Sequence, residues 1–188
     1  MNPLRYVPPA IEPISLLEAK AHLRVDHSDE DGYIQSLITV ARQAAETRTE
    51  RTLIQSTWRL VLDRFPQSIP LPMPPIVSVS QITYVDLSGN AVALNPADYF
   101  VDTASEPGWV LPVKGKTFPQ TDTVNAVTVT YVAGYGVTAQ SVPAPIRHWI
   151  LLAVGDLYDQ IRSVSAEKPR VPQNFADSLI DPYRFFGV

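Results

Sequence analysis

The chain has 188 residues, of which 45% are hydrophobic, so it can bury a core and is not a disordered protein. Its net charge is −4 and its 15 basic residues are scattered, which argues against a protein that coats nucleic acid. The absence of cysteine excludes disulfides, thiol catalysis and Cys-ligated zinc.

The N-terminal residues 1–13 contain four prolines among apolar residues, which excludes a helix. We predict an extended arm that lies on the body of the protein or on a neighbouring molecule. The opening sequence MNPLRYVPPA lacks the apolar core of a signal peptide. The longest strongly apolar run, Trp149–Val154, is far shorter than the ~20 residues that span a bilayer, so we expect no membrane segment.

Residues Ile14–Glu46 predict two helices joined by a short acidic hinge. Ser15 and Glu18 have the spacing of a capping box, which predicts that the first helix runs from about Leu16 to Arg24. The acidic residues Asp29, Glu30 and Asp31 place negative charge at the N-terminus of the second predicted helix, which is the positive end of its dipole.

The second helix is predicted over about Asp29–Glu50, with Ser28 or Asp29 as its cap. Its apolar residues recur with the period of an amphipathic helix, and we expect this stripe to pack on a third helix near the C-terminus. The predicted packing face consists of Leu37, Ala41, Ala44, Ala45, Ile150, Val154 and Leu157.

After Thr52 the apolar residues alternate with a period of two, which predicts short strands. The proline-rich segment Ile69–Pro75 can be only an edge strand or a stiff crossover. The other predicted strands begin with the alternation of Trp58, Leu60 and Leu62 and continue as Val77–Val85, Ala91–Leu94, Tyr99–Asp102, Gly108–Pro112 and Val124–Val132. Short antiparallel strands at this spacing indicate a small sandwich or barrel.

A third helix is predicted from Pro143 to Arg162, and the only helices available to pack on it are the first two. The predicted fold class is therefore α+β, a discontinuous helical bundle with an inserted β domain. The predicted domains are an arm (1–13), a helical domain (14–55 and 142–165), a β domain (56–141) and an extended tail (166–188).

The C-terminal tail carries apolar anchors, which distinguishes it from a disordered polar tail. Tyr, Phe and Arg are typical interface residues, so we expect the tail to dock on a partner, with packing on its own subunit as the alternative. The predicted docking residues are Leu179, Ile180, Tyr183, Arg184, Phe185 and Phe186.

The sequence offers no catalytic or metal constellation. Aligning Gly32 with the glycine of a calcium-binding loop places His27 and Ile38 at the two most demanding ligand positions. The acidic residues before Gly32 are therefore better explained by capping and by their interaction with the helix dipole. There is no nucleophile elbow, P-loop or dinucleotide fingerprint. Asp102 and Glu106 lie in a turn-rich stretch, and we predict no enzyme activity, cofactor or metal.

Several blocks of the chain match those of a known family. The stretch Ser15–Arg42 reads S-L-L-E-A-K-A-H-L-R-V-D-H-S-D-E-D-G-Y-I-Q-S-L-I-T-V-A-R and matches the family pattern almost position by position. Further matches are TWRL at Thr57, PPIVSV at Pro74, TVTY at Thr128 and VPAPIR at Val142. Together they resemble the head–tail connector (adaptor) proteins of long-tailed phages, prophages and gene transfer agents.

This resemblance implies a structural protein that forms a ring of about twelve subunits beneath the portal of a virion. Such a ring extends the DNA channel without binding DNA specifically and offers a docking surface to tail, stopper or terminator proteins. The C-terminal segment would reach the portal protein, and the subunit would be made in the cytoplasm of a bacterial host. The alternative function is a carbohydrate- or surface-binding β-module on a helical stalk, with Trp109 as an exposed aromatic residue.

Overall fold

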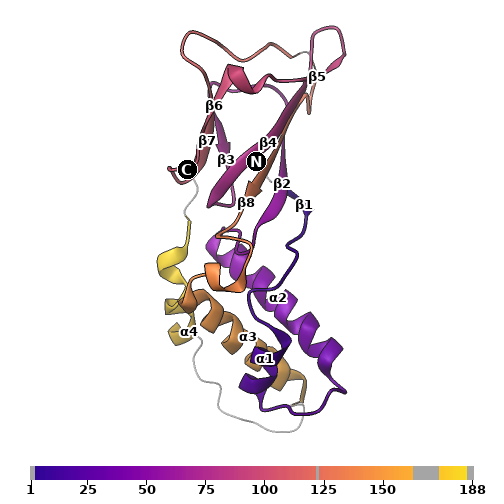
Figure 1. Cartoon of the computed structure of the whole chain (residues 1–188), viewed down its shortest axis with the longest axis vertical. Coiled ribbons are helices and arrows are strands. Elements are labelled where there is room, and N and C mark those ends of the chain that lie inside the picture. Colours follow the sequence, from indigo (N-terminus) through magenta and orange to yellow (C-terminus); the bar gives the residue numbers. More distant parts are fainter. Residues whose placement is uncertain (1–2, 122, 163–173, 186–188) are drawn as a thin grey trace. The chain divides into compact units, whose positions relative to one another are not determined.

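The structure is a computed structural model of the chain, and it describes residues 3–121, 123–162 and 174–185. The chain divides into two compact units, each built from separate stretches of sequence (Figure 1). The β unit comprises residues 1–10, 55–135 and 185–188, and the helical unit comprises residues 11–54 and 136–184. The described residues form helices and antiparallel sheets, so the predicted α+β class is confirmed.

The helical unit is built on two long helices that pack against each other, α2 and α3 (Figure 1). A shorter helix, α1, contacts both of them, and α4 contacts α3. The bounds are α1 Leu16–Leu23, α2 Asp31–Thr49, α3 Ala144–Arg162 and α4 Asn174–Ser178, with 3₁₀ turns η2 at Ala139–Ser141 and η3 at Asp181–Tyr183.

Helix α1 begins with the predicted capping box, which is confirmed. The Ser15 hydroxyl accepts the Glu18 backbone N–H at 3.2 Å, and the Glu18 carboxylate accepts the Ser15 N–H at 2.9 Å. These bonds satisfy donors that a helix start otherwise leaves without partners. Helix α1 ends at Leu23, and the left-handed φ of 57° at Arg24 turns the chain so that the N–H of Val25 donates to the carbonyl of Lys20 at 3.0 Å.

Helix α2 starts differently from the prediction. Its N-terminal cap residue is Glu30, which makes no side-chain capping bond, so the prediction that Ser28 or Asp29 caps this helix is wrong. The acids at this point serve tertiary contacts: the Asp31 carboxylate pairs with Lys20 of α1 at 2.6 Å, and Glu30 accepts a hydrogen bond from the Tyr158 hydroxyl of α3. These contacts tie the hinge to both neighbouring helices.

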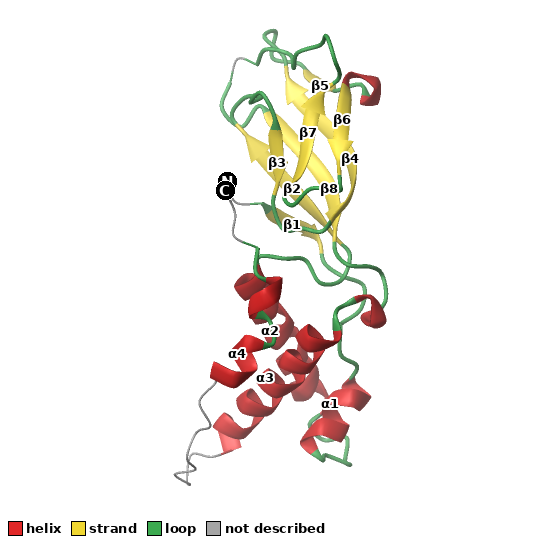
Figure 2. Cartoon of the chain, turned by 90° about the vertical axis from the view of Figure 1, so that its left-hand side faces the viewer, coloured by secondary structure: helices red, strands yellow, loops and turns green. Residues whose placement is uncertain are grey.

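The β unit contains a five-stranded and a three-stranded sheet, whose strands are yellow in Figure 2. The larger sheet has the order β1-β2-β8-β4-β5, and the smaller has the order β3-β7-β6. The bounds are β1 Leu4–Val7, β2 Ser56–Leu62, β3 Ile69–Leu71, β4 Ile76–Val85, β5 Ala91–Ala93, β6 Tyr99–Asp102, β7 Gly108–Pro112 and β8 Val127–Ala133. Neither sheet closes on itself, so the barrel alternative is wrong.

One apolar cluster draws on both sheets. Strand β2 alternates buried and less buried residues, as the predicted period of two requires. The buried members of the cluster are Trp58, Leu60, Leu62, Ile69, Leu71, Ile76, Ile82, Leu94, Val110, Val127, Val129, Tyr131 and Ala133. Tyr131 satisfies its buried hydroxyl by donating to the carbonyl of Pro72 at 2.9 Å, and burial raises the pKa of this phenol.

The N-terminal segment adds an edge strand to the larger sheet. Strand β1 pairs antiparallel with β2, with Leu4 opposite Arg59 and Arg5 opposite Trp58. The Arg5 guanidinium also lies 4.6 Å from the Trp58 ring centroid, a cation–π distance. The segment is extended, as its prolines predict, and residues 4–7 lie on the chain's own β unit.

Among the residues that the structure describes, no helix combines the length and apolar character needed to cross a bilayer.

Candidate assembly surfaces

The C-terminal segment is fastened to the end of α2 by two arginines. Arg48 pairs with Asp177 at 3.0 Å, and Arg51 Nε donates to the backbone carbonyl of Tyr183 at 2.6 Å. Ile180 lies between these contacts and is fully buried. Residues 177–183 therefore hold a fixed position on the helical unit, in an arrangement that combines charge pairing with one apolar anchor.

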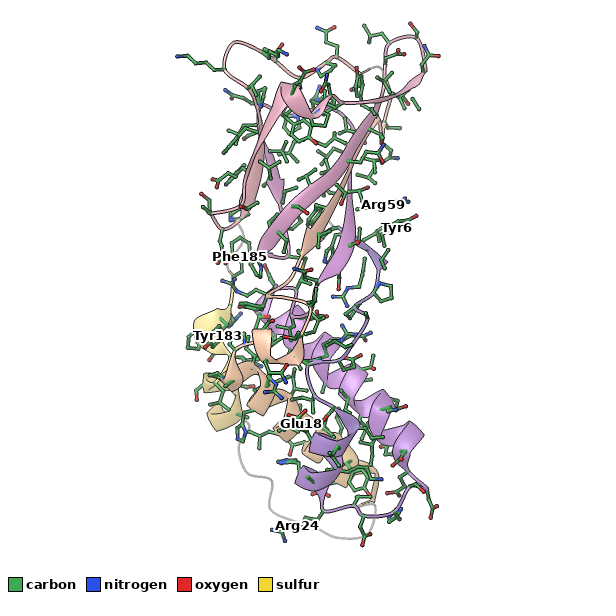
Figure 3. The ribbon with its side chains drawn as sticks, in the orientation of Figure 1. Tyr6, Glu18, Arg24, Arg59, Tyr183 and Phe185 are labelled. Atoms are coloured by element: carbon green, nitrogen blue, oxygen red, sulfur yellow. The ribbon has the colours of Figure 1, made fainter. Side chains whose placement is uncertain are left out.

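This position decides which predicted docking residues are available. The prediction that Ile180 docks on a partner is wrong for this arrangement, because its side chain is buried within the subunit. Leu179, Tyr183 and Phe185 are half-buried and Arg184 is exposed, so each presents some surface (Figure 3 labels Tyr183 and Phe185). Phe186 lies outside the described residues.

The predicted helix-packing face is buried with one clear exception. On α2, Leu37, Ala41 and Ala45 are buried, whereas Ala44 is exposed and does not belong to the face. On α3, the remaining predicted residues are Ile150 and Val154, which are fully buried, and Leu157, which is half-buried.

Ala44 was misassigned because the buried arc of α2 extends to polar residues on its other side. Arg42 and Glu46 are each only 3% exposed, and Thr49 is fully buried. At 100° per residue these positions lie on the side of the Ala41–Ala45 stripe away from Ala44. The predicted face was built from apolar residues alone, so it left out these polar residues and placed the buried arc too far toward Ala44.

The buried charges form a network that joins three parts of the helical unit. Arg42 Nε contacts Glu12 at 2.7 Å, and Arg42 Nη1 contacts Glu46 at 2.6 Å. The second oxygen of Glu46 accepts the backbone N–H of Leu53 at 3.1 Å. The network therefore fixes the entry into α1 and the chain after α2 to the same turn of α2. The i, i+4 spacing of Arg42 and Glu46 was the signal that could have found it.

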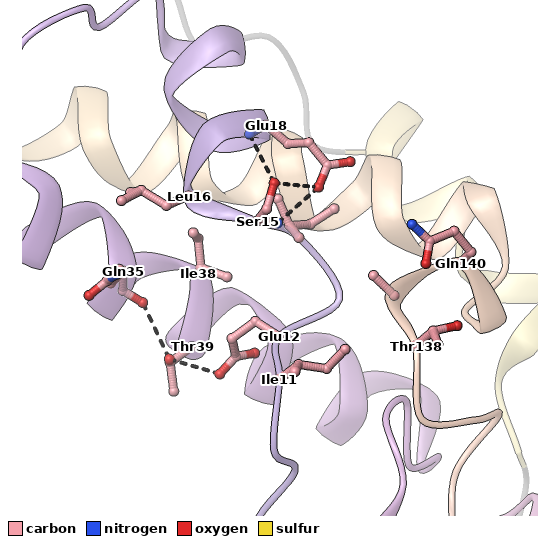
Figure 4. Close-up of a pocket in the computed structure, with 12 residues that line it drawn as sticks. Ile11, Glu12, Ser15, Leu16, Glu18, Gln35, Ile38, Thr39, Thr138 and Gln140 are labelled. Atoms are coloured by element: carbon pink, nitrogen blue, oxygen red, sulfur yellow. Dashed lines mark hydrogen bonds between the residues drawn. The ribbon is translucent and has the colours of Figure 1, made fainter.

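An open groove of about 910 Å³ lies at the start of α1 (Figure 4). Residues of the α1 entry, α2 and the η2 turn line it, including Ile11, Ile38 and Thr39. Its carboxylates are Glu12 and Glu18, and both are engaged: Glu12 with Arg42 and Thr39, and Glu18 with Ser15 and Arg147. The N–H of Ser15 is the main cause of the lowered pKa of Glu18. Ionised, paired carboxylates are suited to holding structure and not to proton transfer.

The other candidate chemical groups have structural positions. Within the described ranges, no cluster of three or more His, Asp or Glu side chains could hold a metal ion. In the acidic hinge, His27 and Asp29 lie 4.0 Å apart and are both well exposed. Asp102 accepts bonds from Ala104 and Ser105 in its own turn.

Comparison with known families gives a match at residues 13–85. The matching family model is that of the phage gp6-like head–tail connector protein. This part of the chain is a head–tail connector segment. The resemblance noted from the sequence is thereby confirmed, over a stretch that contains α1 and α2 and continues through β2, β3 and β4. The match indicates a structural, non-enzymatic protein. No curated protein matches the chain.

Solved structures extend the similarity of fold to the whole chain. A chain in the neck of an empty gene transfer agent particle, computed with C6 symmetry, has a TM-score of 0.79 at 22% identity, with 100% of this chain and 97% of that chain covered. A chain in the virion of a native gene transfer agent particle gives 0.80 at 21% identity, with coverage of 100% and 97%. A third, in a native neck computed with C12 symmetry, gives 0.74 at 22% identity, with coverage of 100% and 96%. This chain therefore has the fold of those structures.

Proposed function

We propose that the chain is a structural subunit of the head–tail junction of a phage or gene transfer agent virion. The observation that carries this proposal is the connector match at residues 13–85, together with a fold that agrees over the full chain with neck subunits. In this proposal the subunits form a ring beneath the portal, extend the DNA channel and present a surface to tail, stopper or terminator proteins.

We propose that the two sheets form a two-layer sandwich and that this β domain interrupts a single helical domain. The shared apolar cluster supports the first part, because its members come from both sheets. Packing of α2 on α3 supports the second, because these helices are separated in sequence by residues 55–135 of the β unit. Compact units of this kind suit a ring subunit, because each can present the same surface at every position around the axis.

The proposed ring is consistent with simple geometry and with the charge of the chain. A heterologous contact that is repeated around an axis closes when the rotation between subunits divides a full turn. A net charge of −4 leaves the channel with little attraction for phosphates, so DNA can slide through it without being held. The proposed copy number is about twelve, which is compatible with the C12 symmetry used for one of the similar necks.

We propose that the C-terminal segment docks on the portal through Leu179, Tyr183, Arg184 and Phe185, with Phe186 beyond the described residues. The Arg48 and Arg51 contacts support this role, because they hold the segment in one place before a partner arrives. Ordering the segment in advance lowers the entropy lost on binding. Ile180 acts as the anchor within the subunit.

The experiment is a mass measurement of the purified chain, alone and mixed with portal protein. We expect a ring of defined mass in at least one of these conditions, and a chain that stays monomeric in both would contradict the proposal. Removing residues 184–188 retains the Arg51–Tyr183 contact and should leave a folded, ring-forming chain that binds portal at least about tenfold more weakly. Leu17→Ala on α1, which alters a side chain that is 79% exposed, is the matched control and should bind portal normally.

A further inference from the structure

The β unit carries exposed apolar side chains on the outer faces of both sheets. In the five-stranded sheet, Leu4, Tyr6 and Val61 are 68%, 53% and 38% exposed. In the three-stranded sheet, Phe100 and Leu111 are 60% and 37% exposed. Apolar residues that are scattered singly over a surface need no explanation, whereas contiguous ones mark an interaction site.

The strand register shows that these residues are contiguous. Leu4 is paired with Arg59 across β1 and β2, and Val61 lies two residues further along β2, so all three share one face. In the smaller sheet, Phe100 is paired with Leu111, and Asp102 is paired with Trp109 one pleat away. We define the arginine face as Leu4, Tyr6, Arg59 and Val61, and the aspartate face as Phe100, Asp102, Trp109 and Leu111.

A single guanidinium lies within the arginine face. The Arg59 guanidinium carbon is 3.4 Å from the centroid of the Tyr6 ring, and the two side chains lie together in Figure 3. Arg59 Nε is covered and has no hydrogen-bond partner among the described residues. Stacking on an aromatic ring orients a guanidinium and leaves its terminal Nη donors for a carboxylate, which is the partner whose geometry it matches best.

A single carboxylate lies within the aspartate face. Asp102 accepts hydrogen bonds from the Ser105 hydroxyl at 2.6 Å and from the Ala104 N–H at 2.9 Å. These bonds, the Ser105 hydroxyl first, hold the pKa of Asp102 below its usual range, so the group is ionised at neutral pH. The turn fixes its position beside the partly exposed Trp109.

We infer that the arginine face of one copy docks on the aspartate face of the next copy around the ring. This inference rests on the proposed ring and names the surfaces that build it in the β unit. A ring needs two different patches that point away from each other on one subunit. In the proposed sandwich both sheets contribute to one core, so their outer faces point away from that core in opposite directions. Each face surrounds one charge with apolar side chains, and the two charges have opposite signs, which sets both partner and register.

The test reverses the two charges separately and together. Arg59→Glu alone and Asp102→Arg alone should each raise the concentration needed for half-assembly at least about tenfold, because like charges then meet at every contact. The Arg59→Glu/Asp102→Arg double variant restores opposite charges and should assemble near the wild-type concentration. An equimolar mixture of the two single variants should also assemble. The two variants would alternate around an even-numbered ring, so that opposite charges meet at every contact. Mass measurement with and without portal is the readout.

Two variants control for changes unrelated to the contact. Arg64→Glu reverses an exposed charge elsewhere in the β unit. Asp86→Arg removes a carboxylate that also accepts backbone N–H groups in its own turn, from Ser88 and Asn90, so it matches the local damage of Asp102→Arg. Both control variants should assemble at the wild-type concentration.

The possible failures are distinguishable. A wild-type chain that never assembles contradicts the ring itself and this inference with it. A wild-type chain that assembles while both single variants assemble equally well contradicts only this inference. The inference alone is likewise contradicted if neither the double variant nor the mixture recovers assembly. It is also contradicted if the variants assemble normally but lose portal binding, because the faces would then serve another partner.

Discussion

The two units of this chain keep their charges in different places. In the helical unit, Arg42 and Glu46 are buried and paired, and the C-terminal segment is held by further ion pairs. In the β unit the buried core cluster contains no charged side chain, and charges such as Arg59 lie on the outer faces. The helical unit thus uses its charges to hold its own fold, whereas the β unit presents them to its surroundings.

The largest expected effect concerns two adjacent alanines of α2. Ala45→Asp places an unpaired carboxylate at a fully buried position and should destabilise the helical unit by about 4 kcal/mol or more. Ala44→Asp, at an exposed position, should change stability by no more than about 0.5 kcal/mol. Urea unfolding with hydrogen exchange of α2 and α3 peptides measures the difference. Equal effects at the two positions would contradict the buried arc described for α2.

The next effect tests the buried charge network. Arg42→Met leaves Glu46 buried without its guanidinium and should cost about 3–5 kcal/mol in the helical unit. Arg42→Met/Glu46→Leu removes both charges and should recover part of that loss. Arg24→Met, at an exposed arginine of the same unit, is the control. Hydrogen exchange of β-unit peptides should stay unchanged, and a uniform loss in both units would mean that the network is not specific to the helical one.

A smaller effect is expected in the β unit. Tyr131→Phe removes the bond to the Pro72 carbonyl and should cost about 1–2 kcal/mol. Because burial raises the pKa of Tyr131, the folded state keeps the phenol neutral while the unfolded chain ionises near pH 10. The stability from this group is fully present below about pH 10 and falls as the pH rises further. The variant should lack that alkaline decline, and an identical decline in both proteins would contradict the assignment.

The smallest effect is at the start of α1. Ser15→Ala removes one half of the capping box and should cost about 1 kcal/mol, whereas Ser15→Thr should cost much less. The lowered pKa of Glu18 implies that its contribution is present above its ordinary value near 4.5 and is lost as the pH falls through its lower value in the folded state. Thermal melts at pH 7 and at pH 3 would show the gap between wild type and Ser15→Ala narrowing at low pH.

The sequence predicted local structure better than tertiary contacts. The capping box and the strands Tyr99–Asp102 and Gly108–Pro112 were predicted because capping and alternation are encoded by neighbouring residues. The cap of α2 was missed because Glu30 and Asp31 contact residues on other helices. Ala44 was misplaced for a similar reason: the arc that a helix buries depends on what packs against it, which periodicity alone does not give.

Contacts between segments that are distant in the chain could not be predicted from the sequence either. The contact of Arg51 with Tyr183 joins residues 132 positions apart, and no local pattern encodes it. The stack of Tyr6 on Arg59 depends on how β1 registers with β2, and the sequence predicted only that the N-terminal segment is extended. The connector family was recognisable even so, because the residues of α1 and α2 carry its pattern in one continuous stretch.

The division of the helical unit has a consequence for synthesis of the chain. Helix α2 ends at Thr49 and its packing partner α3 begins at Ala144, so a ribosome must translate residues 55–135 of the β unit between them. At roughly 5–20 residues per second, that interval lasts on the order of 5–20 seconds. During it the apolar stripe of α2 has no α3 to cover it, while the strands of the β unit can already pair. The order of emergence therefore favours a β unit that folds first and a helical unit that closes only when α3 arrives.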